Sequence, residues 1–429
     1  MGSATREPIA VIGTGYVGLV TAAGFAELGS EVWCVDIDAG KIAQLERGEI
    51  PIYEPGLAES VVANRERLHF STELAPALEH CRLLFVAVGT PPTYSGDADL
   101  SAVHAVVDAM PNSDRHALVM KSTVPVGTGA AIKRAFSERG KTGFGYVSCP
   151  EFLKEGSALE DFRAPDRVVV GDDGDWAGDA VSDLYSPLDA PLVRTDVASA
   201  EMIKLAANAF LATKISFINE IANVCEETGA DVLEVARGMG LDQRIGTHFL
   251  KPGIGFGGSC FPKDVSALKQ LAGNSGYHFQ LLTAVIEVNE LQKRRVIGKL
   301  QKHLGSLVGK RVALLGLAFK ANTDDMREAS SLVLAARLQA DGATVCAYDP
   351  IAEAVARKLM VGVQFADSAL DAVASADACV IVTEWPEFAE LDWGVVAERM
   401  PGRLVIDGRN FVDPDAVRAA GFVYEGVGR

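Results

Sequence analysis

The hydrophobic pattern of the first 150 residues alternates between short apolar runs and longer stretches with helical spacing. The apolar runs have the length of strands and cover Ile9–Ile12, Glu31–Val35, Leu83–Val88, Leu118–Lys121 and Phe144–Cys149. Helical spacing is found between them, for example at Ala102–Met110 and Thr128–Arg139. Strands that alternate with helices predict a parallel sheet covered by helices on both faces.

The pattern changes after about Thr195. Glu201–Glu227 contains neither proline nor glycine and repeats apolar residues at helical spacing, which predicts one long helix. Further helices are expected at Asp231–Arg237, Val265–Ala272 and Leu282–His303. The middle of the chain is therefore expected to be helical.

Alternation returns in the last third. We expect strands at Lys310–Leu315, Thr344–Tyr348, Ala378–Val382 and Leu404–Ile406, with a helix at Ser331–Asp341. The prediction is an α/β protein in which two Rossmann-like, doubly wound domains are joined by a central helical domain with a long helix. The expected boundaries are 1–195, 196–305 and 306–429.

Composition narrows the range of partners. The 429 residues include 40 Lys and Arg against 57 Asp and Glu, which gives a net charge of -17 and argues against nucleic acid or an anionic membrane as a partner. The seven cysteines are scattered and never form a C-x-x-C pair, as expected of reduced thiols in the cytoplasm. Neither an apolar leader nor an apolar run of about 20 residues is apparent, so we expect a cytoplasmic protein without membrane spans.

A glycine motif follows the first expected strand. Gly13, Gly15 and Gly18 have the spacing G-x-G-x-x-G, and Asp36 closes the next strand. In this context the glycines allow a tight turn, backbone approach to a pyrophosphate and close helix packing, and the acid accepts a hydrogen bond from the ribose. Because Asp36 would repel a 2′-phosphate, the motif favours NAD over NADP. The last third repeats the pattern weakly, with Gly316-Leu317-Ala318 in place of the motif and Asp349 after the next strand.

A second glycine-rich stretch, Gly255–Asp264, contains a candidate nucleophile. Pro262 suits the first turn of a helix, which places Cys260 beside the positive end of that helix and near Lys263. Such surroundings favour a thiolate, and the acid Asp264 lies four residues further on. Cys34, Cys225 and Cys379 are better interpreted as small buried hydrophobic residues.

Two further patterns have both a functional and a plain interpretation. Lys204 and Asn208 lie four residues apart and share one face of the long helix. From this spacing alone, a solvated lysine is the preferred explanation. Lys121–Pro125 and Cys149–Gly156 follow expected strands, where doubly wound sheets bind ligands. The seven histidines show no metal-ligand spacing, so no metal is expected.

Taken together, these residues resemble the nucleotide-sugar 6-dehydrogenase family over nearly the whole chain. Besides Gly13–Gly18 and Gly255–Asp264, the matching motifs are Glu54-Pro55-Gly56, Val88–Pro91, Lys121–Thr128, Pro150–Gly156, Glu201–Asn208, Phe319–Glu328 and Asp407-Gly408-Arg409. The resemblance implies oxidation of the sugar C6 alcohol to a carboxylate by two NAD⁺ in succession. Cys260 would form a thiohemiacetal and then a thioester, which water hydrolyses.

The resemblance also implies roles for other residues. Lys204 and Asn208 would stabilise oxyanions, Thr123 and Asp264 would position or deprotonate a water molecule, and Glu151 would accept a proton. The choice of base between Glu151 and Asp264 stays open. Around the cofactor the resemblance places Gly13, Gly15, Tyr16, Val17, Gly18, Asp36, Lys41, Thr90, Thr123, Glu155, Lys263 and Arg327. Around the sugar nucleotide it places Glu151, Phe152, Leu153, Lys154, Glu155, Lys204, Asn208, Arg244, Phe249, Lys251, Gly257, Lys320 and Arg409.

The substrate expected from the resemblance is UDP-glucose. Four segments are most similar to those of members that oxidise UDP-glucose to UDP-glucuronate, a precursor of polysaccharides: Glu155–Ala158, Asp161-Phe162, Pro165–Arg167 and Asp242–Gly246. Members acting on GDP-mannose or a UDP-N-acetylhexosamine match less well. Outside the family, the alternatives are a two-electron β-hydroxyacid dehydrogenase and a non-catalytic nucleotide sensor. The family is usually dimeric through the long helix, although a helix buried within one chain is the competing explanation.

Overall fold

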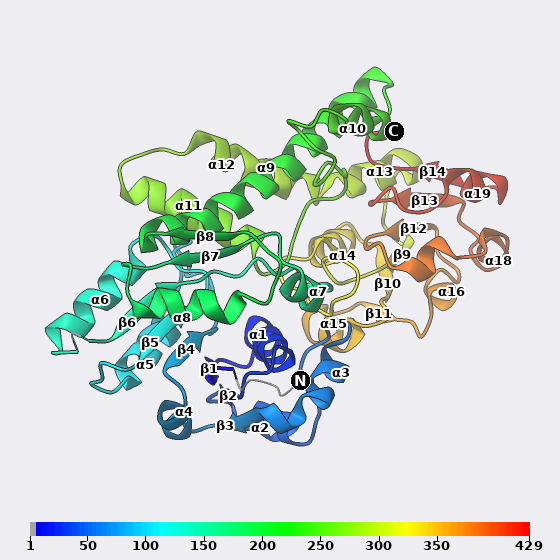
Figure 1. The fold of residues 1–429 in the computed structure, drawn as a ribbon. Coiled ribbons are helices and arrows are strands. Elements are labelled where there is room, and N and C mark those ends of the chain that lie inside the picture. The colour runs from blue at the N-terminus through cyan, green and yellow to red at the C-terminus, as the bar shows by residue number, and fades with distance from the viewer. Residues whose placement is uncertain (1–5, 142) are drawn as a thin grey trace. The chain divides into compact units, whose positions relative to one another are not determined.

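The computed structural model describes residues 6–141 and 143–429 (Figure 1). The chain divides into two compact units: Met1–Ala207 with Gln270–Gly276, and Asn208–Lys269 with Tyr277–Arg429. We call them unit 1 and unit 2. The long helix α9 (Val197–Thr228) contributes its first eleven residues to unit 1 and the remainder to unit 2. The predicted three-domain boundaries stay a prediction.

Unit 1 contains an eight-stranded sheet in the order β3-β2-β1-β4-β5-β6-β7-β8. Its strands are β1 (Ile9–Ile12), β2 (Val32–Val35), β3 (Leu68–Ser71), β4 (Leu83–Val86), β5 (Ala117–Met120), β6 (Gly145–Ser148), β7 (Val168–Gly171) and β8 (Leu192–Thr195). The pairs are parallel except β6 with β7, which are antiparallel through Ser148 and Gly171. The strands predicted in this part of the chain correspond to β1, β2, β4, β5 and β6, and they pair in parallel as expected, whereas β7 was not predicted.

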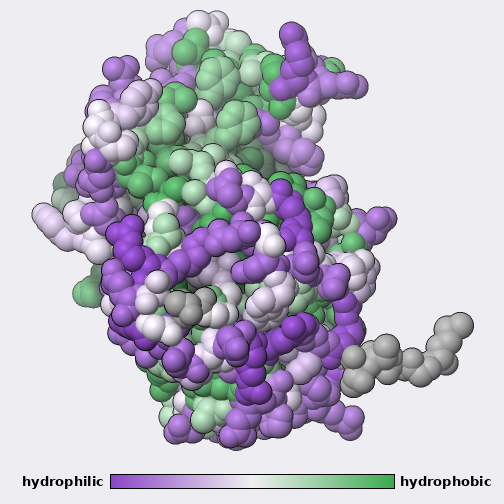
Figure 2. Space-filling model, turned by 60° about the vertical axis from the view of Figure 1, so that its left-hand side comes forward, coloured by the Kyte–Doolittle hydropathy of each residue, from purple (hydrophilic) through white to green (hydrophobic). Residues whose placement is uncertain are grey.

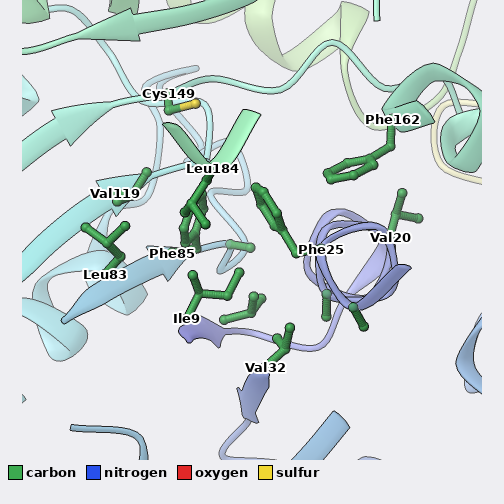
Figure 3. Packing of buried hydrophobic residues seen from close by; sticks show 14 of the residues in the cluster. Ile9, Val20, Phe25, Val32, Leu83, Phe85, Val119, Cys149, Phe162 and Leu184 are labelled. Carbon is green, nitrogen blue, oxygen red and sulfur yellow. The ribbon is translucent and has the colours of Figure 1, made fainter. Parts of the chain in front are cut away.

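The helices of unit 1 cover this sheet. They are α1 (Tyr16–Glu27), α2 (Ala39–Glu46), α3 (Leu57–Ala63), α4 (Ala75–His80), α5 (Ser101–Ala109), α6 (Thr128–Glu138), α7 (Ala158–Arg163) and α8 (Trp176–Tyr185). Phe25 of α1 packs against Phe85, Phe162 and Tyr185 with ring centroids 5.2, 5.2 and 5.0 Å away. Figure 3 shows this core, in which α1 lies beside the buried strands. Aromatic burial of this kind is a large apolar contribution to stability.

The helix α9 confirms the predicted long helix and begins four residues earlier than expected. Glu201 anchors its first turns, because the carboxylate accepts hydrogen bonds from the backbone N–H of Gly127 (2.7 Å) and Gly129 (2.8 Å) at the start of α6. The other helices of the middle region are α10 (Val232–Gly240), α11 (Phe261–Asn274), α12 (Gln280–Gln292) and α13 (Arg295–Leu304).

The single helix predicted over Leu282–His303 is wrong, because α12 and α13 are separated at Lys293-Arg294. Arg294 N–H bonds to the carbonyl of Leu291, three residues back, so the helical ladder is interrupted. Lys293 is 1% exposed, and its ammonium pairs with Glu290 (2.8 Å) and Glu328 (3.4 Å). The latter contact is tertiary, and the helical pattern of the sequence contains no signal for it.

Unit 2 contains a six-stranded parallel sheet in the order β11-β10-β9-β12-β13-β14. Its strands are β9 (Arg311–Leu315), β10 (Thr344–Tyr348), β11 (Gln364–Phe365), β12 (Ala378–Ile381), β13 (Leu404–Asp407) and β14 (Val423–Glu425). Its helices are α14 (Ser330–Ala340), α15 (Glu353–Leu359), α16 (Ala369–Ala372), α17 (Pro386–Ala389), α18 (Trp393–Arg399) and α19 (Pro414–Ala419). This order is the 3-2-1-4-5-6 order of a Rossmann fold, and the first six strands of unit 1 share it. The predicted fold class is confirmed.

Asp349 shows how the second Rossmann fold differs from the first. Its buried carboxylate accepts hydrogen bonds from the backbone N–H of Leu317 (2.6 Å) and Ala318 (3.1 Å) and from the indole of Trp385 (3.0 Å). The other oxygen accepts from Ile351 and Ala352. These five donors use the carboxylate within the fold, so Asp349 fixes the β9 turn.

Candidate active site

The turn between β1 and α1 has the geometry that the glycine motif predicts. Gly13 has φ +98°, and a side chain there would meet the Ala87 carbonyl at 2.6 Å. A Cβ on Gly18 would overlap the Gly13 carbonyl, so this glycine allows α1 to pack on the turn. Nothing lies within 4 Å of a Cβ at Gly15, which is also the N-cap of α1. Its open side and the helix N-terminus behind it suit a pyrophosphate.

Asp36 directly follows β2 and faces the same turn. Its Oδ2 accepts from the N–H (2.7 Å) and hydroxyl (2.8 Å) of Thr14, and its Oδ1 accepts from Asp38 N–H (3.0 Å). Burial opposes the charged form, but the hydrogen bonds from Asp38 and Thr14, together with the charge of Lys41, lower the pKa of Asp36. The ionised carboxylate keeps acceptor capacity on Oδ1, as a ribose hydroxyl requires.

Tyr16 belongs to a network of hydrogen bonds around the buried carboxylate of Glu54. Its hydroxyl bonds to the carboxylate of Glu54, and burial together with this carboxylate raises the pKa of Tyr16. Glu54 also accepts from the N–H groups of Gly156 and Ala158, both at 2.6 Å, at the start of α7. Glu54 thus ties the glycine turn to the Pro150–Gly156 loop. The Glu54-Pro55-Gly56 motif was the only sequence signal for this contact.

The loops after β4 and β5 lie side by side. The Thr90 hydroxyl donates to the Thr123 carbonyl (2.9 Å), and the Ser122 hydroxyl donates to the Val88 carbonyl (2.6 Å). Thr90 is buried, whereas Thr123 is partly exposed. These bonds hold two predicted cofactor residues at the carboxyl edge of the sheet, where doubly wound folds bind ligands.

A buried ion pair joins α9 to the loop after β6. Lys204 Nζ lies 3.1 Å from Glu151 Oε1, and the two side chains are 4% and 6% exposed. The other carboxylate oxygen of Glu151 accepts from Leu153 N–H (2.5 Å). The interpretation of Lys204 as a solvated lysine is therefore wrong, because tertiary packing covers the helix face that spacing alone leaves undetermined. Charges are rarely buried unless they are paired.

Phe152 and Arg167 line the space beside this pair. The Arg167 guanidinium lies 3.5 Å from the centre of the Phe152 ring, and Lys204 Nζ lies 5.3 Å from the same ring. Burial lowers the pKa of Arg167. A cavity of about 60 Å³ is lined by Glu151, Phe152, Arg167, Lys121 and Tyr185 among others, with room for a few water molecules. The sequence motifs included Arg167 but gave it no role.

The remaining predicted residues of this loop are more exposed. Lys154 Nζ pairs with Asp161 at 2.6 Å, and Lys154 N–H donates to the same carboxylate at 2.8 Å. Leu153 and Glu155 are partly exposed. Of the predicted residues in this loop, Glu151 and Phe152 are therefore the ones that unit 1 brings against Lys204.

Unit 2 contains Cys260 directly before α11. The backbone carbonyl of Cys260 accepts from Asp264 N–H (2.8 Å), which makes Cys260 the N-cap residue of the helix. All seven cysteines are free, and Cys260 is partly exposed while the other six are buried. A cysteine at a helix N-terminus with access for a ligand is a typical position for a reactive thiol. The predicted placement of Cys260 at the helix start is confirmed.

Asp264 connects Cys260's helix to α9. Asn208 Nδ2 donates to Asp264 Oδ2 (2.6 Å), and Lys263 Nζ donates to Asp264 Oδ1 (2.6 Å). Asp264 is 1% exposed and Asn208 is 6% exposed. Within unit 2, Asn208 therefore holds the buried carboxylate of Asp264.

Three predicted residues stand near the glycine stretch of unit 2. A Cβ on Gly257 would overlap the Glu328 carbonyl, and Gly258 N–H donates to the Arg327 carbonyl at 2.8 Å. Arg409 donates to the carbonyls of Val382 (2.7 Å), Gly255 (3.2 Å) and Phe319 (3.4 Å). Arg409 thereby braces the backbone of this region.

The other predicted substrate and cofactor residues of unit 2 lie in loops. Arg244 pairs with Asp242 (2.6 Å), and Arg327 pairs with Asp325 (2.7 Å). Lys251 and Lys320 lie over the rings of Phe411 and Phe319, at 5.5 and 5.4 Å. Phe249 has φ +62° and packs against Phe261 with centroids 6.1 Å apart. Their roles toward a ligand stay predictions.

Two features are absent from the part of the chain that the structure describes. Residues 6–141 and 143–429 contain no group of three or more His, Cys, Asp or Glu that could hold a metal ion. Within those ranges no helix combines the length and apolar character needed to cross a membrane.

An oxidoreductase that uses an NAD-type dinucleotide is the class that this fold and these side chains define. The chain belongs to the UDP-glucose/GDP-mannose dehydrogenase family, whose NAD binding, central and UDP binding domains match residues 7–189, 198–291 and 313–414. The UDP-glucose 6-dehydrogenase TuaD of Bacillus subtilis is 47% identical over 430 residues, covering 99% of this chain and 93% of the relative. A UDP-glucose 6-dehydrogenase of Pseudomonas aeruginosa is 46% identical over 441 residues, covering 98% and 97%. Among solved structures, a UDP-glucose dehydrogenase from Pyrobaculum islandicum has a TM-score of 0.92 at 38% identity and covers 100% of this chain and 99% of that one.

Proposed function

We propose that the protein is a UDP-glucose 6-dehydrogenase that oxidises UDP-glucose to UDP-glucuronate with two NAD⁺. The observation that carries the proposal is the position of Cys260, the one cysteine that is not buried, as the N-cap of α11. A thiol so placed is what covalent oxidation of an aldehyde requires. The identities of 47% and 46% to named UDP-glucose 6-dehydrogenases over nearly the whole chain support this substrate.

The glycine turn of unit 1 fits the cofactor. The open side of Gly15 leaves room for the pyrophosphate, and Asp36 remains able to accept from a ribose hydroxyl. The proposed NAD-binding residues also include Tyr16 and Val17 beside the motif glycines. The others are Lys41, Thr90, Thr123, Glu155, Lys263 and Arg327. NAD, when bound, supplies the acceptor for one hydride in each of the two oxidations.

The protein's own side chains carry the rest of the chemistry. In the first oxidation the C6 hydroxyl loses its proton to a base, Glu151 or Asp264, while Lys204 stabilises the developing oxyanion. Cys260 Sγ then adds to C6 of the aldehyde to give a thiohemiacetal, and the second oxidation yields a thioester. Water, positioned by Thr123 and Asp264, attacks C6, the C–S bond breaks, and the carboxylate leaves with the thiolate regenerated. Asn208 keeps Asp264 in place and donates toward the same oxyanions.

The proposed sugar-nucleotide site uses locally placed cations in an acidic chain. The cations proposed to bind the diphosphate and uracil are Lys154, Arg244, Lys251, Lys320 and Arg409. The residues proposed to contact the remainder of the ligand are Phe152, Leu153, Phe249 and Gly257. The UDP binding domain of the family matches residues 313–414, which supports a nucleotide site in unit 2.

We also propose that two copies of the chain associate through α9 in the cytoplasm. Phe210, Phe217 and Val224 lie seven residues apart and are 66%, 49% and 57% exposed. This spacing places them on one face of the helix. Figure 2 shows hydrophobic areas among hydrophilic ones on the face that it draws. A second copy of α9 would remove these side chains from water.

The stoichiometry of NADH tests the function. Limiting UDP-glucose is incubated with excess NAD⁺, NADH is counted by absorbance, and the sugar product is identified by mass spectrometry. GDP-mannose and UDP-N-acetylmannosamine serve as parallel substrates. The proposal predicts two NADH per UDP-glucose and none from GDP-mannose.

Other outcomes would redirect the proposal. One NADH per sugar would indicate a two-electron alcohol dehydrogenase and leave Cys260 without its covalent role. Two NADH from GDP-mannose or the N-acetyl sugar alone would keep the chemistry and change the substrate. Nucleotide binding without any NADH would favour a sensor.

A further inference from the structure

Three buried amide side chains hold the backbone that leads to Cys260. Asn219 of α9 accepts from Gly253 N–H (2.9 Å), and Gln292 of α12 donates to the Gly253 carbonyl (2.9 Å). Asn289 of α12 accepts from Phe256 N–H (2.8 Å) and donates to the Phe256 carbonyl (3.0 Å). All three residues are buried: Asn219 is 0% exposed, Gln292 is 1% exposed and Asn289 is 3% exposed. We call Asn219, Asn289 and Gln292 the amide clamp.

The loop is shaped to admit the clamp. Gly255 has φ +86°, and a Cβ there would stand 2.9 Å from Asn289 Oδ1, closer than real side chains tolerate. Arg409 holds the Gly255 carbonyl as well, at 3.2 Å. The backbone N–H and carbonyl of Gly253, and those of Phe256, are thus hydrogen-bonded to side chains and not to the backbone of a helix or sheet. Buried backbone groups need such partners, but here each partner also fixes where the loop lies.

The clamped segment contacts the start of Cys260's helix. The ring of Phe256 packs edge-to-face on that of Phe261, with centroids 5.7 Å apart and planes at 86°. Phe261 follows Cys260 directly and is the first residue of α11. A shift of Phe256 would therefore be transmitted to the residue that carries the thiol, because close-packed aromatic rings leave little room for independent movement.

Helix packing alone does not account for these amides. Burying an amide group costs free energy unless it is hydrogen-bonded, and apolar residues would join α9 to α12 without that cost. Within the described residues the Asn219 Nδ2 group has no hydrogen-bond partner, although the Oδ1 atom is bonded to Gly253 N–H. Burial of this unpaired amide group lowers the stability of the fold. Buried polar groups retained in this way fix a particular arrangement of the backbone.

We propose that Asn289, with Asn219 and Gln292, is a positioning residue that holds Cys260 at the N-terminus of α11 in its reactive orientation. The proposal rests on the proposed function, since it gives Cys260 the role of nucleophile. It adds that the reactivity of Cys260 depends on side chains of α9 and α12 that act through the backbone of Gly253 and Phe256.

The test compares Asn289→Leu with a matched control, Ser216→Ala. Leucine has nearly the same size as asparagine but cannot bond to Phe256. Ser216 is 3% exposed and joins the same two helices, since its hydroxyl donates a hydrogen bond to the Val285 carbonyl (3.0 Å). Each full-length variant is treated with iodoacetamide at pH 7 without ligands, and labelling of Cys260 is followed by mass spectrometry. The six buried cysteines serve as internal references.

We expect Asn289→Leu to slow alkylation of Cys260 at least threefold and to lower kcat at least tenfold, because the thiol leaves the helix end that favours the thiolate. Ser216→Ala should change both less than twofold. Equal alkylation rates in the two variants would overturn the proposal, whatever their turnover. If Asn289→Leu shows no cooperative unfolding transition, Gln292→Leu takes its place under the same criterion. Alkylation needs neither sugar nor NAD⁺, so a wrong substrate assignment would leave this result interpretable.

Discussion

Buried and exposed cations of the predicted site differ in how strongly they can act on a developing negative charge. Lys204 and Arg244 are both cations that the family resemblance implicates, yet Lys204 is enclosed beside Glu151 while Arg244 is exposed and paired with Asp242. An enclosed cation interacts more strongly with a developing negative charge, since water does not screen it. Lys204 is therefore the cation that we expect to dominate the chemistry.

Replacing the proposed nucleophile should separate binding from turnover. Cys260→Ser is expected to lower kcat by a factor of about 100 or more, because a hydroxyl is a much weaker nucleophile than a thiolate. NAD⁺ binding, measured by calorimetry, should be unchanged. Cys346, buried in β10, provides a control: Cys346→Ala should keep kcat within about twofold, since surface or core substitutions away from the site alter stability before rate. Full turnover in Cys260→Ser would exclude the covalent route.

Removing the ammonium of Lys204 should affect stability and rate in different ways. Lys204→Met leaves Glu151 buried without this partner, so we expect a loss of roughly 3 kcal/mol in the free energy of unfolding. We also expect kcat to fall by about 100-fold or more, as when an oxyanion donor is deleted. The double variant Lys204→Met with Glu151→Gln should recover much of the stability and none of the rate. Recovery of both would show that Lys204 serves the fold alone.

Long elements of this fold are fixed by a few polar contacts at their ends. The start of α9 is anchored by Glu201, and its last turns are anchored by Glu226, which accepts from Lys299 (2.7 Å) and from Gly428 N–H (2.8 Å). Glu425 of β14 accepts from the same Lys299 (3.0 Å) and contacts His303. This cluster joins α9, α13 and the last strand within unit 2.

The cluster should make the stability of unit 2 depend on acid pH. Burial favours the neutral form of both carboxyls, but hydrogen bonds from Lys299 to Glu226, and from His303 and Lys299 to Glu425, lower the pKa of each below the ordinary 4.5. Their stabilising effect is complete above pH 4.5 and is lost as the pH falls through the lowered values. Calorimetry should show Tm falling in that range.

Lys299→Met is the matching test of this pH dependence. It should lower Tm at pH 7 and flatten the fall of Tm below pH 4.5, because the two carboxyls would keep more ordinary pKa values in the folded state. Parallel Tm curves for the variant and the natural chain would show that other carboxyls control acid unfolding.

Assembly is a property of the complete chain and its surface. Phe210→Glu with Phe217→Glu places charges on the exposed apolar face of α9, and light scattering should show the mass of one chain instead of two. Val361→Glu alters a more exposed apolar side chain, 86% exposed, that lies off this helix, and should leave the mass unchanged. A monomer in the natural chain would end the dimer proposal.

Local signals predicted those features that depend on short stretches of chain. Gly13, Gly18 and Asp36 act within one strand-turn-helix-strand segment, so their spacing already defined the turn and the acid. Alternating apolar runs gave most of the strands, and an uninterrupted helical pattern gave α9. The position of Cys260 at a helix start followed from Pro262 and the preceding glycines.

Contacts between distant segments could not be predicted from the sequence, because hydrophobic periodicity does not specify which segments pack together. The separation of α12 from α13 goes with the burial of Lys293 beside Glu328, and Lys204 becomes buried only when the loop after β6 covers it. Asp349 and Asp36 follow equivalent strands, yet neighbouring N–H groups use the hydrogen-bonding capacity of Asp349 and leave Asp36 able to accept a further hydrogen bond.

Asn289 and Gln292 look like ordinary polar positions of a helix in the sequence. Their meaning depends on a loop more than thirty residues away, because the free energy of a buried polar group is set by the partners that folding brings to it.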